Sequence, residues 1–284
     1  VFIYKGERKQ DYYISLINSL SKENHKENHI FYNECDKKYY AIEEKTALCI
    51  AFERENIEII KLLLENEKID INYIYRTLVN DWLFDKKTAL YMAVELGNIE
   101  IINLLLRNKN IHINDPYYNN YYNHNNYECW DEEETKTPLY LAIKNKKIEI
   151  VKILLENKDI DIDNVFRFSS EEDVEYDEDR THGNISENKT ALYAAVESGD
   201  TEIVKLLLSY KNLDPNLVCR FEGHYSDYQS TYEFTEKVTA LHLAVKKGKT
   251  EIVKYLLQNK ELDIDLKYFF FTERYDDEDI RIYL

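Results

Sequence analysis

The sequence predicts an all-α solenoid in which pairs of short helices stack one on the next, and three observations support this. A 27-residue stretch occurs five times without a gap, its copies starting at Thr46, Thr88, Thr137, Thr190 and Thr239. In every copy the third residue is Leu and the sixth is Ala. The thirteenth is always Glu, and an Ile follows it. Such regularity indicates structural units that bury their apolar faces only against their neighbours.

Each copy carries the signals of two helices. In the fourth copy, the side-chain oxygen of Thr190 can cap the start of a first helix. Gly199 breaks that helix, and Asp200 can cap a second one, so we expect helices over about 191–198 and 201–209. The invariant Glu then falls in the first turn of the second helix, where the helix dipole favours a negative charge. These residues are Glu58, Glu100, Glu149, Glu202 and Glu251.

The copies resemble the ankyrin repeat. The resemblance rests on TALYAAVESGDTEIVKLLL, which starts at Thr190, and is closer still in TALHLAVKKGKTEIVKYLL, which starts at Thr239. Two features depart from the family pattern. The family's His after T-P-L is present only as His242, and its G-A-D-V-N run is replaced by a glycine-free form such as 66–72. We therefore expect a different turn after the second helix. The other copies carry Cys49, Tyr91, Tyr140 and Tyr193 at the His position.

The junctions between copies are long. The copies lie 42, 49, 53 and 49 residues apart, whereas the family's period is about 33. The resemblance implies that each junction is a β-hairpin finger, so the predicted fold is an all-α, ankyrin-type solenoid with extended β-hairpin or loop fingers. In the fourth finger we expect the turn at Gly223 and His224. The segment 115–127, rich in Asn and Tyr, is a candidate for a loosely ordered tip.

Both ends of the chain fall outside the repeats. Residues 1–45 are expected to form an N-terminal cap or the remnant of a preceding repeat, with an amphipathic helix over 11–21 and a loop over 22–33. The solenoid is expected to cover 46–284, with 266–284 as a C-terminal finger. The apolar run 269–271 should avoid water, so we expect it to fold back on the stack or to meet a further repeat.

Charge and cysteine usage narrow the possible partners. The net charge is −17, of which the five copies carry −4, so the acidity lies mainly in the other segments. This composition argues against binding to nucleic acid or to an anionic membrane surface, because both need cationic side chains. It allows a basic protein partner, or serves solubility alone. The four cysteines form no CxxC pair, and this sequence shows no signal-peptide core and no apolar run long enough to span a membrane. We therefore expect a cytoplasmic or nuclear protein.

No pattern of catalytic or metal-binding residues emerges from the sequence. His25 and His29 lie one helical turn apart, but Lys26 stands where a zinc protease needs Glu. We therefore expect no catalytic residue, no metal and no cofactor. Arg76, Arg167 and Arg220 each lie thirty residues after the Thr of their copy. They form either a binding row or, as we favour, salt bridges between neighbouring fingers.

Two functions remain open at this point. In the first, the chain is a monomeric, non-enzymatic module that binds another protein on a concave surface. In the second, it is the non-catalytic arm of a larger enzyme or channel; the only methionine, Met92, suggests that the chain is a fragment. The resemblance implies candidate partner-binding residues on the finger flanks and first helices: Glu43, Lys45, Glu53, Arg54, Asp85, Lys87, Glu95, Leu96, Glu134, Lys136, Lys144, Asn145, Glu187, Lys189, Glu197, Ser198, Glu236, Val238, Lys246 and Lys247.

Overall fold

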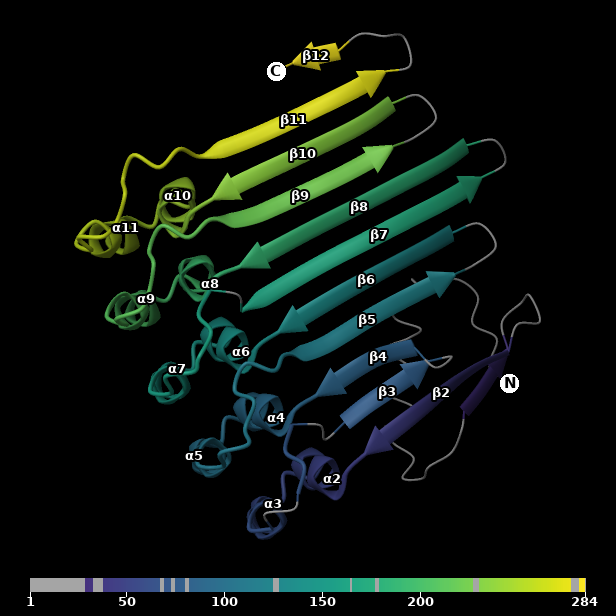
Figure 1. Cartoon of the computed structure of the whole chain (residues 1–284), viewed down its shortest axis with the longest axis vertical. Helices are drawn as coiled ribbons and strands as arrows, with labels where there is room; N and C mark the ends of the chain where they lie inside the picture. Colours follow the sequence, from purple (N-terminus) through teal and green to yellow (C-terminus); the bar gives the residue numbers. More distant parts are fainter. Residues whose placement is uncertain are drawn as a thin grey trace.

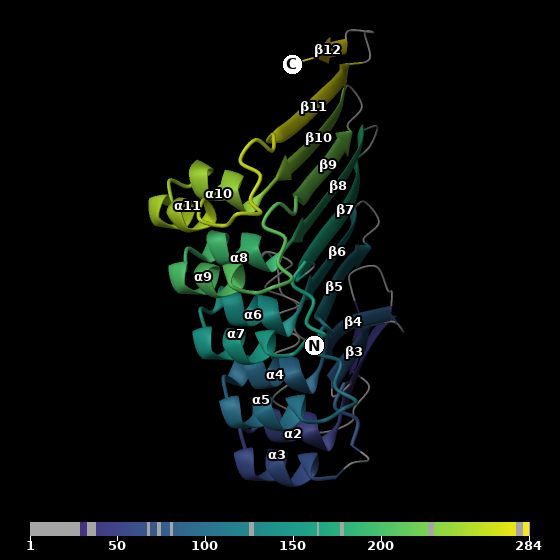
Figure 2. The same cartoon turned by 60° about the vertical axis from the view of Figure 1, so that its left-hand side comes forward.

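The computed structural model consists of a stack of helix pairs and a long antiparallel sheet along one edge of the stack (Figures 1 and 2). It describes residues 29–32, 38–66, 69–72, 75–79, 82–124, 128–163, 165–176, 179–226, 230–276 and 281–283. The predicted helix at 11–21 lies outside the described residues. The division of the chain at residue 45 therefore stays a prediction.

The described part of the chain contains five helix pairs, one for each copy. They are α2 (Ala47–Glu53) with α3 (Ile57–Leu64), α4 (Ala89–Leu96) with α5 (Ile99–Leu106), α6 (Pro138–Lys144) with α7 (Ile148–Leu155), α8 (Ala191–Ser198) with α9 (Thr201–Leu208), and α10 (Ala240–Lys246) with α11 (Thr250–Leu256). The fourth pair matches the prediction to within one residue. The predicted stack of helix pairs is therefore confirmed.

The predicted caps are present. The Thr that begins each copy accepts a hydrogen bond from the backbone amide three residues later, as Thr190 Oγ1 does from Tyr193 N at 3.2 Å. Asp200 Oδ1 accepts from the amides of Glu202 and Ile203 at 3.0 and 3.1 Å. The invariant Glu lies in the first turn of each second helix. These bonds satisfy amides that a helix start leaves without a partner.

The sheet corrects the predicted fold class. Its strands are β1 (His29–Tyr32), β2 (Lys38–Lys45), β3 (Tyr75–Val79), β4 (Trp82–Lys87), β5 (Tyr117–His124), β6 (Glu128–Lys136), β7 (Phe166–Tyr176), β8 (Asp179–Lys189), β9 (Cys219–Ser226), β10 (Ser230–Val238), β11 (Phe269–Asp276) and β12 (Arg281–Tyr283). They form one 12-stranded sheet in chain order. The helix-pair solenoid holds, but the all-α class does not, because the extended fingers pair with one another along their edges and satisfy their backbone groups there.

The finger sequences were only partly predicted. Gly223 and His224, expected to form a turn, lie within β9 and pair with Phe234 and Glu233. The segment 115–127 supplies β5, which pairs with β6 as far as His124. The stretch 269–271 belongs to β11 and stays exposed, so it does not fold back on the stack. The alternative expectation, that it meets a further repeat, stays a prediction. The prediction of a loop over 22–33 is also wrong in part, since His29–Tyr32 forms β1.

An asparagine ladder ties neighbouring repeats together at the turn after the second helix. The side chain of Asn72 donates to Asn110 O at 2.8 Å and accepts from His112 N at 2.9 Å, both in the next repeat. The equivalent Asn114 and Asn216 make the same two bonds to their following repeats. An amide can do this because it offers a donor and an acceptor side by side.

The ladder changes at the third repeat, where Asp163 takes the place of asparagine. An ionised carboxylate accepts hydrogen bonds but cannot donate one to a carbonyl. Among the described residues, Asp163 makes no side-chain bond to the fourth repeat. Partial desolvation, together with the charges of Asp161 and Asp214, raises the pKa of the Asp163 carboxyl above its ordinary value. The ladder therefore contributes less to the interface between the third and fourth repeats than to the other interfaces it spans.

Replacing Asp163 with asparagine is expected to raise the free energy of unfolding by about 0.5–1.5 kcal/mol at neutral pH, since it completes the ladder. A carboxyl with a raised folded-state pKa binds its proton more tightly when folded, so the parent gains stability as the pH falls through that pKa. The advantage of Asp163→Asn should be full at pH 7 and should shrink toward about pH 4. Urea titrations of both proteins across this range test it, and an advantage that grew on acidification would contradict the explanation.

Candidate functional site

The sheet has two faces with different surroundings. One face carries Lys45, Lys87, Lys136, Lys189 and Val238, and we call it the palm face. We call the opposite face the back face. The palm face is turned toward the first helices, because Lys87 Nζ lies 3.4 Å from Glu95 Oε2 of α4 and Tyr117 stacks on Tyr91. The first helices and the palm face together form the concave side that the resemblance implied as a binding surface.

An aromatic seam joins the first helices to the bases of the fingers. Ring centroids lie 5.1 Å apart for Tyr91 and Tyr117, 4.8 Å for Tyr140 and Phe166, and 5.7 Å for Tyr193 and Phe221. His242 and Tyr268 form the same contact in the last repeat, at 5.9 Å. In three copies tyrosine makes this contact in place of the family's His, and in the last copy His242 makes it. Burial raises the pKa of all three tyrosines, so their hydroxyls stay neutral.

The structure places the candidate residues along this concave side. Glu43, Asp85, Glu134, Glu187 and Glu236 lie on β2, β4, β6, β8 and β10, each two residues before the Lys or Val that defines the palm face. The others sit at the ends of the first helices or as their caps: Glu53, Arg54, Glu95, Leu96, Lys144, Asn145, Glu197, Ser198, Lys246 and Lys247. The structure thus places these positions on one side of the molecule, and their role in binding stays a prediction.

Many of the candidate charges neutralise one another. Lys45 lies 2.8 Å from Glu53, and Lys189 lies 3.3 Å from Glu197, so a finger lysine meets the glutamate at the end of its own first helix. Lys87 and Glu95 repeat this arrangement. In the last repeat the signs are exchanged, because Lys246 on the helix pairs with Glu236 on the finger at 3.1 Å. Lys45, Lys87 and Lys189 each stand eight residues before the glutamate that they contact. This constant spacing could have predicted the pairs from the sequence.

An aromatic platform occupies the palm face of the last two complete fingers. It consists of Ile185, Phe221, Tyr225, Tyr232 and Phe234, and none of these was predicted as a site residue. The Tyr225 side chain is 47% exposed and that of Tyr232 is 40% exposed, while Phe221 and Phe234 are half-buried. A Cβ on Gly223 would overlap the ring of Phe234, and one on Gly183 would lie 3.4 Å from Tyr225 Cδ2. The rings therefore lie down over the two glycines and form a flat apolar surface.

Family comparison matches this chain to ankyrin repeats over most of its length. A family model described as ankyrin repeats (3 copies) matches residues 10–117 and 174–268, and the model of the single ankyrin repeat matches 136–165. The chain belongs to the ankyrin repeat family. No curated protein gives a significant match to the sequence. Ankyrin repeats are generally protein–protein interaction modules, and the families that contain them are typically non-catalytic.

The described part of this ankyrin solenoid contains few reactive groups. No cluster of three or more His, Cys, Asp or Glu side chains suited to a metal ion occurs among the described residues. Burial raises the pKa of the Cys219 thiol to about 11, so the sulfur is protonated at neutral pH and is a poor nucleophile. None of the helices described has the length and apolar character needed to span a bilayer.

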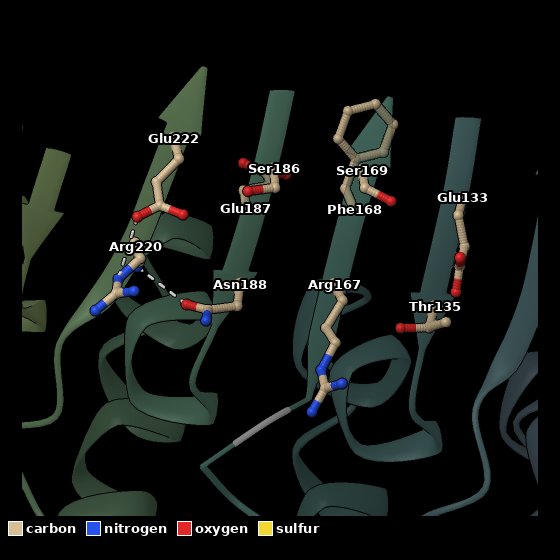
Figure 3. A pocket seen from close by; sticks show the side chains of 10 residues that line it. All are labelled: Glu133, Thr135, Arg167, Phe168, Ser169, Ser186, Glu187, Asn188, Arg220 and Glu222. Atoms are coloured by element: carbon tan, nitrogen blue, oxygen red, sulfur yellow. Dashed lines mark hydrogen bonds and ion pairs between the residues drawn. The ribbon is translucent and has the colours of Figure 1, made fainter. Parts of the chain in front are cut away.

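The back face of the ankyrin fingers carries a trough with charged walls (Figure 3). Arg76 binds Glu44 of the neighbouring finger, which confirms the predicted salt bridge for that residue. Arg220 instead contacts Glu222 on its own strand, with 3.5 Å between Nε and Oε1. A hollow of about 370 Å³ lies over β6, β7, β8 and β9. We call it the trough, and its back-face residues are Glu133, Thr135, Arg167, Ser169, Ser186, Asn188, Arg220 and Glu222.

Proposed function

We propose that this ankyrin repeat protein binds another protein through the palm face and that the aromatic platform is the centre of the contact. The observation that carries the proposal is the exposure of Tyr225 and Tyr232 beside the half-buried rings of Phe221 and Phe234. Apolar side chains gathered on a surface commonly mark an interaction site. Tyrosine is enriched among the residues that supply most of the binding energy.

The surroundings of the platform support a protein partner over a small ligand. Ion pairs such as Lys189–Glu197 and Lys246–Glu236 border it on the side of the helices, and they provide the polar rim that surrounds an apolar contact in many interfaces. The platform residues lie on the paired strands β8, β9 and β10, where Tyr225 of β9 stands opposite Gly183 of β8 and Tyr232 of β10. The rings are thus pre-positioned, which lowers the entropic cost of association.

Selection of displayed peptides and protein fragments against the immobilised chain tests this proposal. Binders should lose at least about tenfold in affinity for Tyr225→Ser and for Tyr232→Ser, as expected when a central aromatic residue is removed. Tyr118→Ser is a matched control, because Tyr118 stands on β5 in register with Lys86 and Thr135 on the back face. The thermal unfolding of all three variants should be compared with that of the parent.

The outcome separates the palm face from the rest of the molecule. Binders that tolerate both platform substitutions but fail on Tyr118→Ser would place the contact on the back face. A set of binders indifferent to all three substitutions would contradict a role for the aromatic platform.

A further inference from the structure

The trough on the back face is built from two rows of side chains in register. Arg167 pairs with Thr135 on one side and with Asn188 on the other, and the Arg220 amide donates to Asn188 Oδ1 at 3.0 Å. The second row lies two residues farther along the strands and runs from Glu133 through Ser169 and Ser186 to Glu222. The row closer to the helices is thus cationic, and the row closer to the finger tips has carboxylates at both ends.

The middle of the trough is low and polar. Ser169 and Ser186 are small and exposed, and with Asn188 they provide hydroxyl and amide groups over β7 and β8. Such groups can donate to or accept from the backbone of an added chain. Figure 3 shows the side chains of Arg167 and Arg220 extending toward the helices, while Ser169 and Ser186 lie farther from the helices along their strands. The charged side chains therefore stand around the serines without covering them.

The charges of the trough are accessible to a partner. The Arg220 side chain is 55% exposed and that of Glu222 is 43% exposed, and 3.5 Å separates their charged atoms. An ion pair this exposed contributes little to stability, so both members can exchange it for partner charges at small cost. The whole chain carries −17, which repels a purely acidic partner at long range. A partner with both signs avoids that repulsion.

We propose that the trough binds an extended peptide segment of another protein with an acidic residue and a basic residue two positions apart. Alternate side chains of an extended chain point to the same side and lie about 6.6–6.8 Å apart, the same step that separates the two rows. The carboxylate then meets Arg167 and Arg220, and the cation meets Glu133 or Glu222. Arginine recognises a carboxylate well because its planar group can make two parallel hydrogen bonds. This site is separate from the palm face and does not depend on the function proposed for it.

Fluorescence polarisation with labelled nine-residue peptides at low salt tests the proposal. The probe has a central Glu-Thr-Arg flanked by threonine and valine, which favour extended chains. Its isomer has the same composition but adjacent Glu and Arg, so their side chains point to opposite sides. We expect the first peptide to bind at least about tenfold more tightly than the isomer and than a Glu-Thr-Glu peptide.

Variants of the protein locate the site. Arg167→Ala with Arg220→Ala should weaken the Glu-Thr-Arg peptide at least about tenfold, and Ser186→Tyr should weaken it by filling the floor without a change of charge. Tyr225→Ser with Tyr232→Ser alters only the palm face and should leave the affinity unchanged. Circular dichroism and thermal unfolding confirm that each variant is folded.

Three results would overturn the proposal. One is the lack of measurable binding of the Glu-Thr-Arg peptide at about 1 mM, the weakest affinity that a specific contact of this kind should show. Another is equal binding of the two isomers, which would mean that charge alone attracts them. The third is full binding to the double arginine variant, which would place the peptide elsewhere.

Discussion

Replacing Leu207 with alanine is expected to lower the free energy of unfolding by about 2–5 kcal/mol. Leu207 lies in α9, its side chain is 0% exposed, and it belongs to the core between neighbouring repeats. The substitution removes apolar contacts and leaves a cavity that the packed helices can only partly fill. Denaturant titration followed by circular dichroism measures the loss.

Leu62→Ala is the matched control for this prediction. Leu62 lies in α3, one position earlier in its repeat than Leu207, and is 65% exposed. Both substitutions exchange the same side chains within a second helix, so differences in helix propensity cancel. Leu62→Ala should change stability by no more than about 0.5 kcal/mol. Equal losses in the two variants would mean that the inside and outside of the stack are wrongly assigned.

Gly97→Ala is expected to cost about 2–4 kcal/mol, more than the same change at Gly248. Both glycines have positive φ, 79° and 63°, where an L side chain is strained by about 1–2 kcal/mol. Of these two glycines, only Gly97 has a described side chain of a neighbouring repeat close to the position of the new Cβ. Lys147 Nζ, from α6–α7 of the next repeat, donates to Val94 O and Glu95 O at 3.1 Å and would lie 2.7 Å from the new Cβ. The displaced lysine loses these charge-assisted bonds.

A double-mutant cycle tests this explanation. In a Lys147→Met background the bonds are already absent, so Gly97→Ala should cost only what Gly248→Ala costs. In the part of the chain that the structure describes, no atom beyond the immediate chain neighbours lies within 4 Å of a Cβ placed on Gly248. Gly248 is therefore the reference for backbone strain alone. If the two glycine substitutions cost the same in the parent, the lysine contributes nothing to the joint between repeats.

The helical stack was predictable because its information is local and occurs five times. The Thr190 cap, the Gly199 break and the Asp200 cap each act within a few residues of sequence. The sheet was not predictable in the same way. Its edges join fingers that lie about fifty residues apart, and the pairing depends on finger length and register, which no single segment records. The all-α class failed for this reason.

The surroundings of the candidate residues were not predictable from the sequence, and their role as a site stays a prediction. The resemblance grouped residues such as Lys45 and Glu53, but only the structure shows that they pair with each other. The aromatic platform was missed because Gly223 signals a turn in sequence. In the structure this glycine is needed within a strand, since the ring of Phe234 lies over it. Alternating aromatics in 221–225 and 232–234 would have revealed the platform once both segments were recognised as strands.

The short joint between β4 and β5 has a mechanical consequence. Among the described residues these strands pair only at Asp85↔Asn119 and Lys86↔Tyr118, whereas β6 and β7 pair from Lys136↔Phe166 to Glu128↔Val174. A sheet bonded along one edge of a stack resists bending in proportion to the bonds that cross each joint. The sheet therefore offers least resistance to a load between the second and third repeats. The fingers of the last three repeats, which carry both the platform and the trough, are joined by longer runs of paired residues.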